Sequence, residues 1–304
     1  MSEPTQIGFI GLGQMGAPMA QRLLGPEVTL HVFDPSETAA RRLTDAGAVG
    51  HASPAAVADV ATLVFACLPS PRVSEDVALG ANGVASGKAI RVHVEMSTIG
   101  TAAIGRIADG LARHGIATVD APISGGPPGA RAGTLAVMAA GAPEALAVAD
   151  AALRRIGRTV YTLGDRPGLG QMMKLVNNLV VAANMASTFE ALVLGAKGGL
   201  DPSTMVDVLN ASTGRSLVTT DIVPRAILPG SFDFGATIAV MDKDVTLGLA
   251  EAASLAVPMW TLEQAARLWR FAVTQGRKSD DMTTMIQMLE DWAGVKVRSQ
   301  GAPD

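Results

Sequence analysis

The first half of the chain alternates short apolar runs, rich in β-branched residues, with alanine-rich stretches that carry helix-capping residues. Two of these stretches have a capping serine, since Ser36 precedes residues 37–46 and Ser53 precedes Pro54. Strand–helix alternation predicts an open, mostly parallel sheet with helices on both faces. The strand pattern occurs at residues 6–10, 29–33, 61–68, 92–95, 117–120, 135–140 and 159–163.

The second half shows only helix patterns. No proline or glycine interrupts the chain from Gln171 to Leu194, so one helix of nearly 28 residues, roughly 40 Å long, can run from 170 to 197. Asp201 and Pro202 then begin another helix, and similar patterns follow at residues 236–253, 259–274 and 282–292. We expect an α/β domain over residues 1–166, an all-helical domain over 167–296 begun by a long interdomain helix, and a tail over 297–304 that is frayed from Ser299 onward.

Composition excludes several classes of protein. Apolar residues make up 48% of the chain, too many for a disordered protein. The 24 basic and 28 acidic residues give a net charge of −4 and no basic stripe, so we expect no nucleic-acid partner. A single cysteine and no cysteine or histidine cluster with zinc spacing predict neither an internal disulfide nor a metal site. The charged fraction of 17%, below the roughly 25% of an average protein, suggests a homodimer or homotetramer that covers part of the surface.

No segment has the pattern of a membrane span. The longest uncharged helical stretch lies between Lys174 and Glu190, and its 15 residues include three asparagines. It is too short and too polar for a hydrocarbon core that needs about 20 apolar residues. The N-terminus is acidic and leads directly into a strand pattern, unlike a signal peptide. We therefore expect a cytoplasmic protein with no membrane partner.

Three glycines with the spacing G-x-G-x-x-G lie between the first strand pattern and the first helix pattern. Gly11 permits a tight turn, Gly13 lets a pyrophosphate approach the backbone, and Gly16 lets the helix pack on the strand. The pyrophosphate would lie at the positive end of that helix. This context predicts a Rossmann-type domain, although a glycine-rich turn of an unrelated α/β fold is the alternative. The dinucleotide-binding segment is Gly11, Leu12, Gly13, Gln14, Met15 and Gly16.

Asp34 ends the second strand pattern, 18 residues after Gly16. A carboxylate at this place accepts hydrogen bonds from the adenosine ribose and repels a 2′-phosphate. No arginine follows at once, because Pro35 and Ser36 come next. These residues favour NAD over NADP as the cofactor; the alternative is that Asp34 only caps the next turn.

A dinucleotide fold usually serves hydride transfer, which needs a group that accepts the proton of the alcohol. All four histidines lie in the first domain, so a histidine base is not expected. Lys174 lies among apolar residues, and both desolvation and a nearby nicotinamide ring would lower its pKa toward the range of a general base. Asn178 shares its helix face and Asn177 is adjacent. The alternative is a lysine that only extends toward solvent between the domains.

Two loops follow strand patterns and carry groups that can hold a ligand. Ser124, Gly125 and Gly126 place a hydroxyl and two glycine amides beyond one strand, and Thr98 lies beyond another. Ligands bind at the carboxyl ends of strands in open α/β sheets, and such amides can hold a carboxylate. Together the two loops outline one cleft.

These residues belong to a series of motifs that identifies a family. The chain resembles the β-hydroxyacid dehydrogenases, the family of 3-hydroxyisobutyrate dehydrogenase and tartronate semialdehyde reductase, over residues 6 to about 293. The motifs, in order, are Gly11-x-Gly13-x-Met15-Gly16, Cys67-Leu68-Pro69, Met96-Ser97-Thr98, Asp120-Ala-Pro-x-Ser124-Gly125-Gly126, Gly168-x-Gly170-x-x-x-Lys174-Leu-x-Asn177-Asn178 and Lys243-Asp244.

The resemblance implies an NAD(P)-dependent oxidoreductase that interconverts a small β-hydroxy acid and its semialdehyde. It implies that Lys174 is the catalytic acid/base and that Asn178 orients the substrate. The other implied site residues are Ser124, Gly125, Gly126, Asn177 and Lys243 for the substrate carboxylate and its surroundings, Thr98 and Lys243 at the nicotinamide end, and Leu68 and Pro69 at the adenosine end.

Two other functions stay open. One is an imine reductase of similar fold, although Lys174 argues against it because those enzymes typically replace this lysine. The other is a non-catalytic dinucleotide-binding module.

The chain departs from the family pattern at two positions. Leu217 stands where 3-hydroxyisobutyrate dehydrogenases tend to have an aromatic residue, and Glu95 stands where the family commonly has aspartate. The sequence does not identify the substrate among small hydroxy acids.

Overall fold

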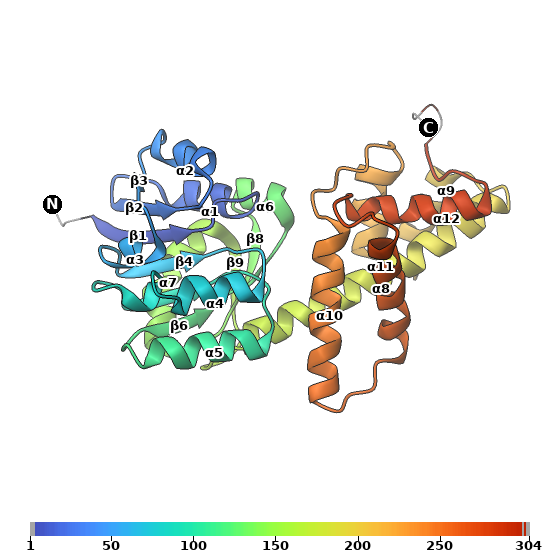
Figure 1. The fold of residues 1–304 in the computed structure, drawn as a ribbon. Coiled ribbons are helices and arrows are strands. Elements are labelled where there is room, and N and C mark those ends of the chain that lie inside the picture. The colour runs from blue at the N-terminus through green and yellow to red at the C-terminus, as the bar shows by residue number, and fades with distance from the viewer. Residues whose placement is uncertain (1–3, 300, 302–304) are drawn as a thin grey trace. The chain divides into compact units, whose positions relative to one another are not determined.

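The computed structural model describes residues 4–299 and 301. The chain divides into two compact units, Met1–Lys174 and Leu175–Asp304. The first is an α/β unit and the second is helical (Figure 1).

The first unit contains a parallel sheet of six strands in the order β3-β2-β1-β4-β5-β6. The strand order reverses between β1 and β4, and ligands of open α/β sheets bind at such a reversal. The strands are β1 (Thr5–Ile10), β2 (Val28–Phe33), β3 (Val49–Gly50), β4 (Leu63–Ala66), β5 (Val92–Glu95) and β6 (Ala117–Asp120).

Helices cover both faces of this sheet, as predicted. Neighbouring strand residues point to opposite faces, so Phe65 belongs to the core that contains α1 and α7, whereas Val64 belongs to the core beneath α3, α4 and α5. Figure 1 shows α4 and α5 as neighbours in this unit, and they are in contact. The helices are α1 (Gly16–Leu23), α2 (Glu37–Thr44), α3 (Pro54–Ala58), α4 (Pro71–Leu79), the short 3-10 helix η1 (Val84–Ser86), α5 (Thr101–Ala112), α6 (Gly126–Ala132) and α7 (Pro143–Ile156).

The last two predicted strands do not join the parallel sheet. They form a separate sheet of three strands, β7 (Ile123–Ser124), β8 (Leu135–Ala139) and β9 (Gly157–Thr162), in which β7 and β8 are antiparallel. The reason is the short link between β6 and β7: a strand added in parallel needs a crossover of a dozen or more residues, and Ala121 and Pro122 are too few.

The second unit is all-helical in the residues that the structure describes, as predicted. Trp269 lies fully buried at its centre and donates a hydrogen bond from Nε1 to the carbonyl oxygen of Ala182 (3.3 Å). Its segments are α8 (Leu169–Lys197), which begins in the first unit, α9 (Pro202–Ala211), η2 (Val218–Ile227), α10 (Ile238–Ser254), α11 (Trp260–Thr274), η3 (Met282–Thr284) and α12 (Met285–Ala293).

Sequence patterns missed η2, which is a π-helix. Pro224 lies inside it. Proline normally interrupts an α-helix because it has no amide hydrogen, so this segment lacks the pattern of an ordinary helix.

Helix α8 is longer than the uncharged stretch considered above, and by length and composition alone it is long and apolar enough to cross a membrane. The buried core helix of a globular unit satisfies the same criterion. In α8 the buried side chains of Leu179, Met185 and Phe189 pack in the core around Trp269.

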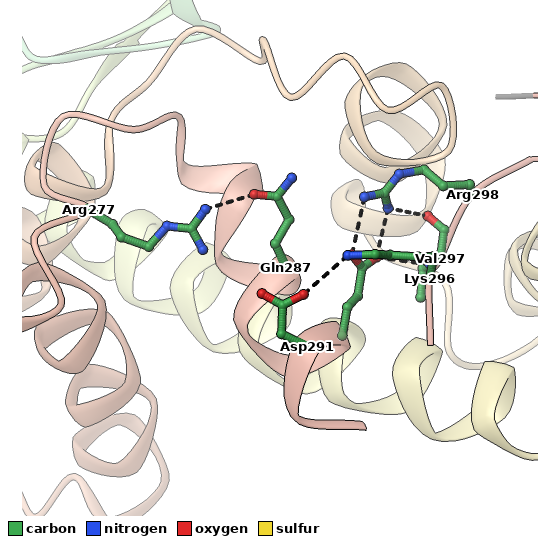
Figure 2. A network of polar contacts seen from close by, with 7 residues as sticks. Arg277, Gln287, Asp291, Lys296, Val297 and Arg298 are labelled. Atoms are coloured by element: carbon green, nitrogen blue, oxygen red, sulfur yellow. Dashed lines mark hydrogen bonds and ion pairs between the residues drawn. The ribbon is translucent and has the colours of Figure 1, made fainter. Parts of the chain in front are cut away.

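The chain stays packed beyond residue 296, where the predicted tail begins. Val297 is fully buried, and the guanidinium of Arg298 contacts the buried carboxylate of Glu290 at 2.7 and 3.2 Å (Figure 2). The amide of Ser299 donates to the carbonyl oxygen of Leu228 (2.9 Å). The prediction of a frayed end was therefore wrong at Ser299, because a buried partner outweighs the polar composition of the segment; residues 300 and 302–304 lie outside the described residues.

Candidate active site

The three motif glycines have different structural requirements. A Cβ atom on Gly11 would lie 2.3 Å from the carbonyl oxygen of Cys67, and one on Gly16 would lie 1.8 Å from that of Gly11. Both positions need glycine for the protein's own packing. A Cβ atom on Gly13 would have no neighbour within 4 Å. Space is thus left open at the position where a pyrophosphate would approach the backbone, so the loop fits a dinucleotide.

Asp34 follows β2 and connects to the glycine-rich loop. Its Oδ2 accepts a hydrogen bond from the amide of Leu12 (2.7 Å), and its Oδ1 accepts one from the amide of Ser36 (2.8 Å). The second bond is the turn cap that we considered as the alternative role. Each carboxylate oxygen has two lone pairs, so capping leaves capacity for ribose hydroxyls.

The loops after β4 and β5 are joined by the buried serine of the Met-Ser-Thr motif, which was not among the predicted site residues. Ser97 Oγ accepts a hydrogen bond from the amide of Leu68 (2.6 Å), and its own amide donates to Glu95 Oε1 (2.9 Å). This contact fixes the segment with Leu68 and Pro69 relative to the one with Thr98, which is half-buried. A hydroxyl directly after a buried strand is the sequence signal that was available.

Cys67 lies one residue beyond β4. Burial, with the nearby Glu95 carboxylate adding to it, raises the pKa of its thiol to about 12. The thiol therefore stays protonated at neutral pH and is a poor nucleophile.

The four histidines have different surroundings. His31 Nδ1 lies 2.9 Å from His51 Nε2, and His31 Nε2 lies 2.8 Å from Gln6 Oε1. Burial lowers the pKa of both imidazoles. His93 is fully buried in the sheet, whereas His114 is exposed beyond α5.

The predicted carboxylate loop joins β7 to α6. Gly125 and Gly126 have φ values of 130° and 61°, which side chains other than glycine rarely adopt. Pro127 and Pro128 follow and have no amide hydrogen. The amides of the two glycines and the half-buried Ser124 hydroxyl are thus the groups in this loop that can hold an anion.

Lys174 lies in the second turn of α8, half-buried, and ends the first unit. One turn earlier, the buried Gln171 forms hydrogen bonds to Asp120 and to the loop after β5. Both residues were missed as parts of the site, because a glutamine and an aspartate have no distinctive spacing when they are 51 positions apart.

The second unit assembles the other predicted residues around a buried aspartate. Asn177 Nδ2 donates to Asn178 Oδ1 (2.9 Å), and Asn178 Nδ2 donates to Asp244 Oδ2 (2.5 Å). Lys243 Nζ lies 2.6 Å from Asp244 Oδ1. Asp244 therefore joins two predicted site residues, Asn178 and Lys243, and its place in the Lys-Asp motif was the signal for it.

The structure thus places the predicted residues in two groups. Asn177, Asn178 and Lys243 belong to the second unit. The first unit contains all the others, in segments that follow its parallel strands or at the start of α8: Gly11, Leu12, Gly13, Gln14, Met15, Gly16, Asp34, Leu68, Pro69, Thr98, Ser124, Gly125, Gly126 and Lys174. Among residues 4–299, no cluster of three histidine, cysteine or acidic side chains has metal-binding geometry.

Sequence comparison connects both units to known proteins. The family model described as the NAD binding domain of 6-phosphogluconate dehydrogenase matches residues 6–164. The model described as "NAD-binding of NADP-dependent 3-hydroxyisobutyrate dehydrogenase" matches residues 168–289. The chain is 37% identical to 2-(hydroxymethyl)glutarate dehydrogenase of Eubacterium barkeri, over 98% of this chain and 99% of that protein. It is 36% identical to 3-hydroxyisobutyrate dehydrogenase of Pseudomonas aeruginosa, over 82% and 85%.

Solved structures agree with this relationship. The 3-hydroxyisobutyrate dehydrogenase of Mycobacterium tuberculosis with L-serine matches with a TM-score of 0.84 and 29% identity, covering 94% of this chain and 99% of that one. Psf3 in complex with NADP+ and 2-OPP matches with a TM-score of 0.80 and 27% identity, covering 93% and 99%. An imine reductase from Pseudomonas sp., at 19% identity and a TM-score of 0.59, shares the fold alone.

Fold and site together define an oxidoreductase with a nicotinamide-dinucleotide-binding domain and a helical second domain. The chain belongs to the β-hydroxyacid dehydrogenase family, as its motifs indicated.

Proposed function

We propose that this protein is an NAD-dependent dehydrogenase of a small β-hydroxy acid, with Lys174 as the acid/base. The observation that carries the proposal is the composition of the first unit. One compact body holds the open glycine loop at Gly13, the anion-binding groups of residues 124–126 and the lysine at the start of α8. Binding, orientation and proton transfer are the tasks that a protein must perform for hydride transfer to a bound cofactor.

Each site residue has its own task in the proposed reaction. When bound, the nicotinamide dinucleotide supplies the acceptor for the hydride of the carbinol carbon. Ser124 and the amides of Gly125 and Gly126 hold the substrate carboxylate, which restricts the orientation of that carbon. Lys174 Nζ, in its neutral form, takes the hydroxyl proton during oxidation and returns it during reduction of the semialdehyde. The Asn178 amide, itself held by Asp244, orients the substrate.

The substrate class is supported by the names of the relatives, which are dehydrogenases of 2-(hydroxymethyl)glutarate, 3-hydroxyisobutyrate and, at 32% identity, L-threonate. Each of these acids carries a hydroxyl on the carbon next to the α-carbon. An assay of NADH and NADPH formation with these three acids, glycerate, serine and 4-hydroxybutyrate tests the proposal. Reduction of cyclic imines without oxidation of any hydroxy acid would instead support the imine reductase alternative. Binding of dinucleotide without turnover of either class would support a non-catalytic module.

Asp34 is the basis for proposing NAD rather than NADP. In the variant Asp34→Asn with Pro35→Arg, the repulsion of a 2′-phosphate is lost and a cation is gained. Hydrogen bonds to charged groups contribute about 1.5–3 kcal/mol. We therefore expect the NADP-to-NAD ratio of kcat/KM to rise at least about tenfold.

Two single variants separate the contributions. Pro35→Arg alone tests the cation, and Asp34→Asn alone tests the repulsion, while its remaining side-chain oxygen can still accept from the Leu12 amide. A wild-type enzyme that already prefers NADP, as the name of the second family model permits, would contradict the proposal.

We also propose that the chain is a homodimer or homotetramer, with most of the interface on the second unit. That unit exposes large apolar side chains: Leu194 on α8 is 74% exposed, Trp260 on α11 82% and Trp292 on α12 64%. Exposed apolar surface of this kind is typical of interfaces. Light scattering at micromolar concentration should show at least twice the mass of 31.1 kDa. A monomer at that concentration would contradict it.

A further inference from the structure

Asp120 and Gln171 form a fully buried pair in the first unit, at the carboxyl end of β6 and the first turn of α8. Asp120 Oδ2 accepts hydrogen bonds from the amides of Gly168 and Gln171 (2.9 Å each), and its Oδ1 accepts one from Gln171 Nε2 (2.8 Å). A carboxylate from another element thus caps the N-terminus of α8, where a negative charge is also favoured by the helix dipole.

The glutamine side chain uses its whole hydrogen-bonding capacity. Oε1 accepts from the amides of Ile99 (2.8 Å) and Gly100 (3.0 Å), and Nε2 donates to Asp120 and to the carbonyl oxygen of Ser97 (3.0 Å). With two lone pairs and two protons all engaged, its amide has one possible orientation. Gln171 therefore ties the start of α8 to both sides of Thr98.

The packing at this point is close. A Cβ atom on Gly170 would lie 2.4 Å from the carbonyl oxygen of Met138 and 2.9 Å from Asp120 Oδ2. The first turn of α8 consequently cannot shift toward β6 and β8. Lys174 is three residues beyond Gln171, about 4.5 Å along the axis of the same helix.

We propose that Asp120 and Gln171 are positioning residues of the reaction, which fix Lys174 and the loop with Thr98 in one geometry. This inference rests on the function proposed above. A displacement of a reacting group by about 1 Å can cost on the order of 10²-fold in rate. Neither side chain needs to touch the substrate or the cofactor for this role.

The charges around the pair determine how it responds to substitution. Burial, together with the Glu95 carboxylate on β5, raises the pKa of Asp120 to about 6, although the hydrogen bonds from Gln171 and Gly168 act in the opposite direction. Glu95 itself lies 3.8 Å from His93, and Cys67 stays a neutral thiol. Lys174 lies on α8. The site thus tolerates the Asp120 carboxylate because amide donors surround it, whereas a carboxylate at position 171 would turn one of its oxygens toward Asp120 Oδ1 and the carbonyl oxygen of Ser97, which donate nothing.

Gln171→Glu is the most informative variant, because it keeps the shape and both acceptor contacts to Ile99 and Gly100. Its second oxygen faces Asp120 Oδ1 and the carbonyl oxygen of Ser97, which are both acceptors, so one of the two carboxyls must keep a proton. Raising the pH removes that proton, and the two carboxylates at positions 120 and 171 then repel each other and move apart. We expect the ratio of the variant's kcat to that of the wild type to fall at least about tenfold from pH 6 to pH 9.

The double variant D120N/Q171E restores one carboxyl and one amide with their positions exchanged. The loss at high pH should disappear in the double variant, although its contact with the carbonyl oxygen of Ser97 is not restored. Gln275→Glu, at an exposed glutamine beyond α11, adds the same charge elsewhere and should leave the pH profile unchanged. Circular dichroism and NAD titration at pH 6 and pH 9 measure the folded fraction, to which each kcat is normalised.

Two results would overturn the positioning role. One is a Gln171→Glu enzyme whose normalised kcat stays within twofold of the wild type across this range. The other is a double variant with the same loss at high pH as the single one, because that loss would then not come from the Asp120–Gln171 pair. If Lys174→Ala is itself active, the proposed function fails; if that variant is inactive and Gln171→Glu behaves like the wild type, only the positioning role fails.

Discussion

Lys174→Ala should lower kcat for hydroxy-acid oxidation by at least about 10²-fold, the lower end of the range for an acid/base group. The dissociation constant for NAD should change little, because in the proposed site the glycine loop and Asp34 hold the dinucleotide. In the wild type, oxidation should decline toward acid pH, since a protonated lysine cannot accept the hydroxyl proton. The measurement is steady-state kinetics from pH 6 to pH 10, with NAD binding followed by fluorescence.

Lys174→Arg is the matched control for charge and length. A guanidinium keeps its proton at every working pH and cannot act as the base, so this variant should be as inactive as Lys174→Ala. Turnover near the wild-type rate in either variant would disprove the proposed mechanism, whatever the fold. Unchanged NAD binding in an inactive variant shows that the loss does not come from misfolding.

The largest expected effect on stability comes from Glu290, whose carboxylate is completely buried on α12. It accepts hydrogen bonds from the Arg298 guanidinium and from the Val297 amide (2.9 Å) (Figure 2). Arg298 is itself nearly buried and lies over the ring of Phe232, 4.5 Å from its centre. Removing one member of a buried ion pair leaves the other charge without compensation, which typically costs about 3–5 kcal/mol. Glu290→Gln should lower the free energy of unfolding by about 3 kcal/mol, measured by urea denaturation.

Asp291→Asn is the control next to it in the chain. Asp291 is 67% exposed and pairs with Lys296 at 3.2 Å, and exposed ion pairs contribute about 0–1 kcal/mol. Glu290→Gln together with Arg298→Met removes both buried charges and should recover part of the loss. Equal effects of Glu290→Gln and Asp291→Asn would show that the buried pair does not anchor the C-terminal segment.

Local sequence was sufficient to predict those features whose interactions join residues close together in the chain. The strands β5 and β6 have the predicted bounds, because buried parallel strands appear as continuous apolar runs between breaks. The caps at Ser53 and Asp201 are present, with side chains that accept from the amides of Ala56 and Thr204. The glycine spacing indicated the dinucleotide loop for the same reason, since its turn, its close approach and its helix contact all lie within six residues.

Other features needed the tertiary structure, because their partners are distant in the chain or their bonds depend on burial. Asp120 lies 51 positions from Gln171, and Asn178 lies 66 positions from Asp244, so no periodicity connects them. Arg298 is only eight positions from Glu290, yet a polar segment after a helix has no pattern that predicts its burial. The sequence by itself determined the family, the two kinds of domain and the candidate base at Lys174. Only the tertiary structure decided which buried polar groups hold that lysine's helix in place, because a hydrogen bond inside a protein is specified by the position of its partner and not by residue type alone.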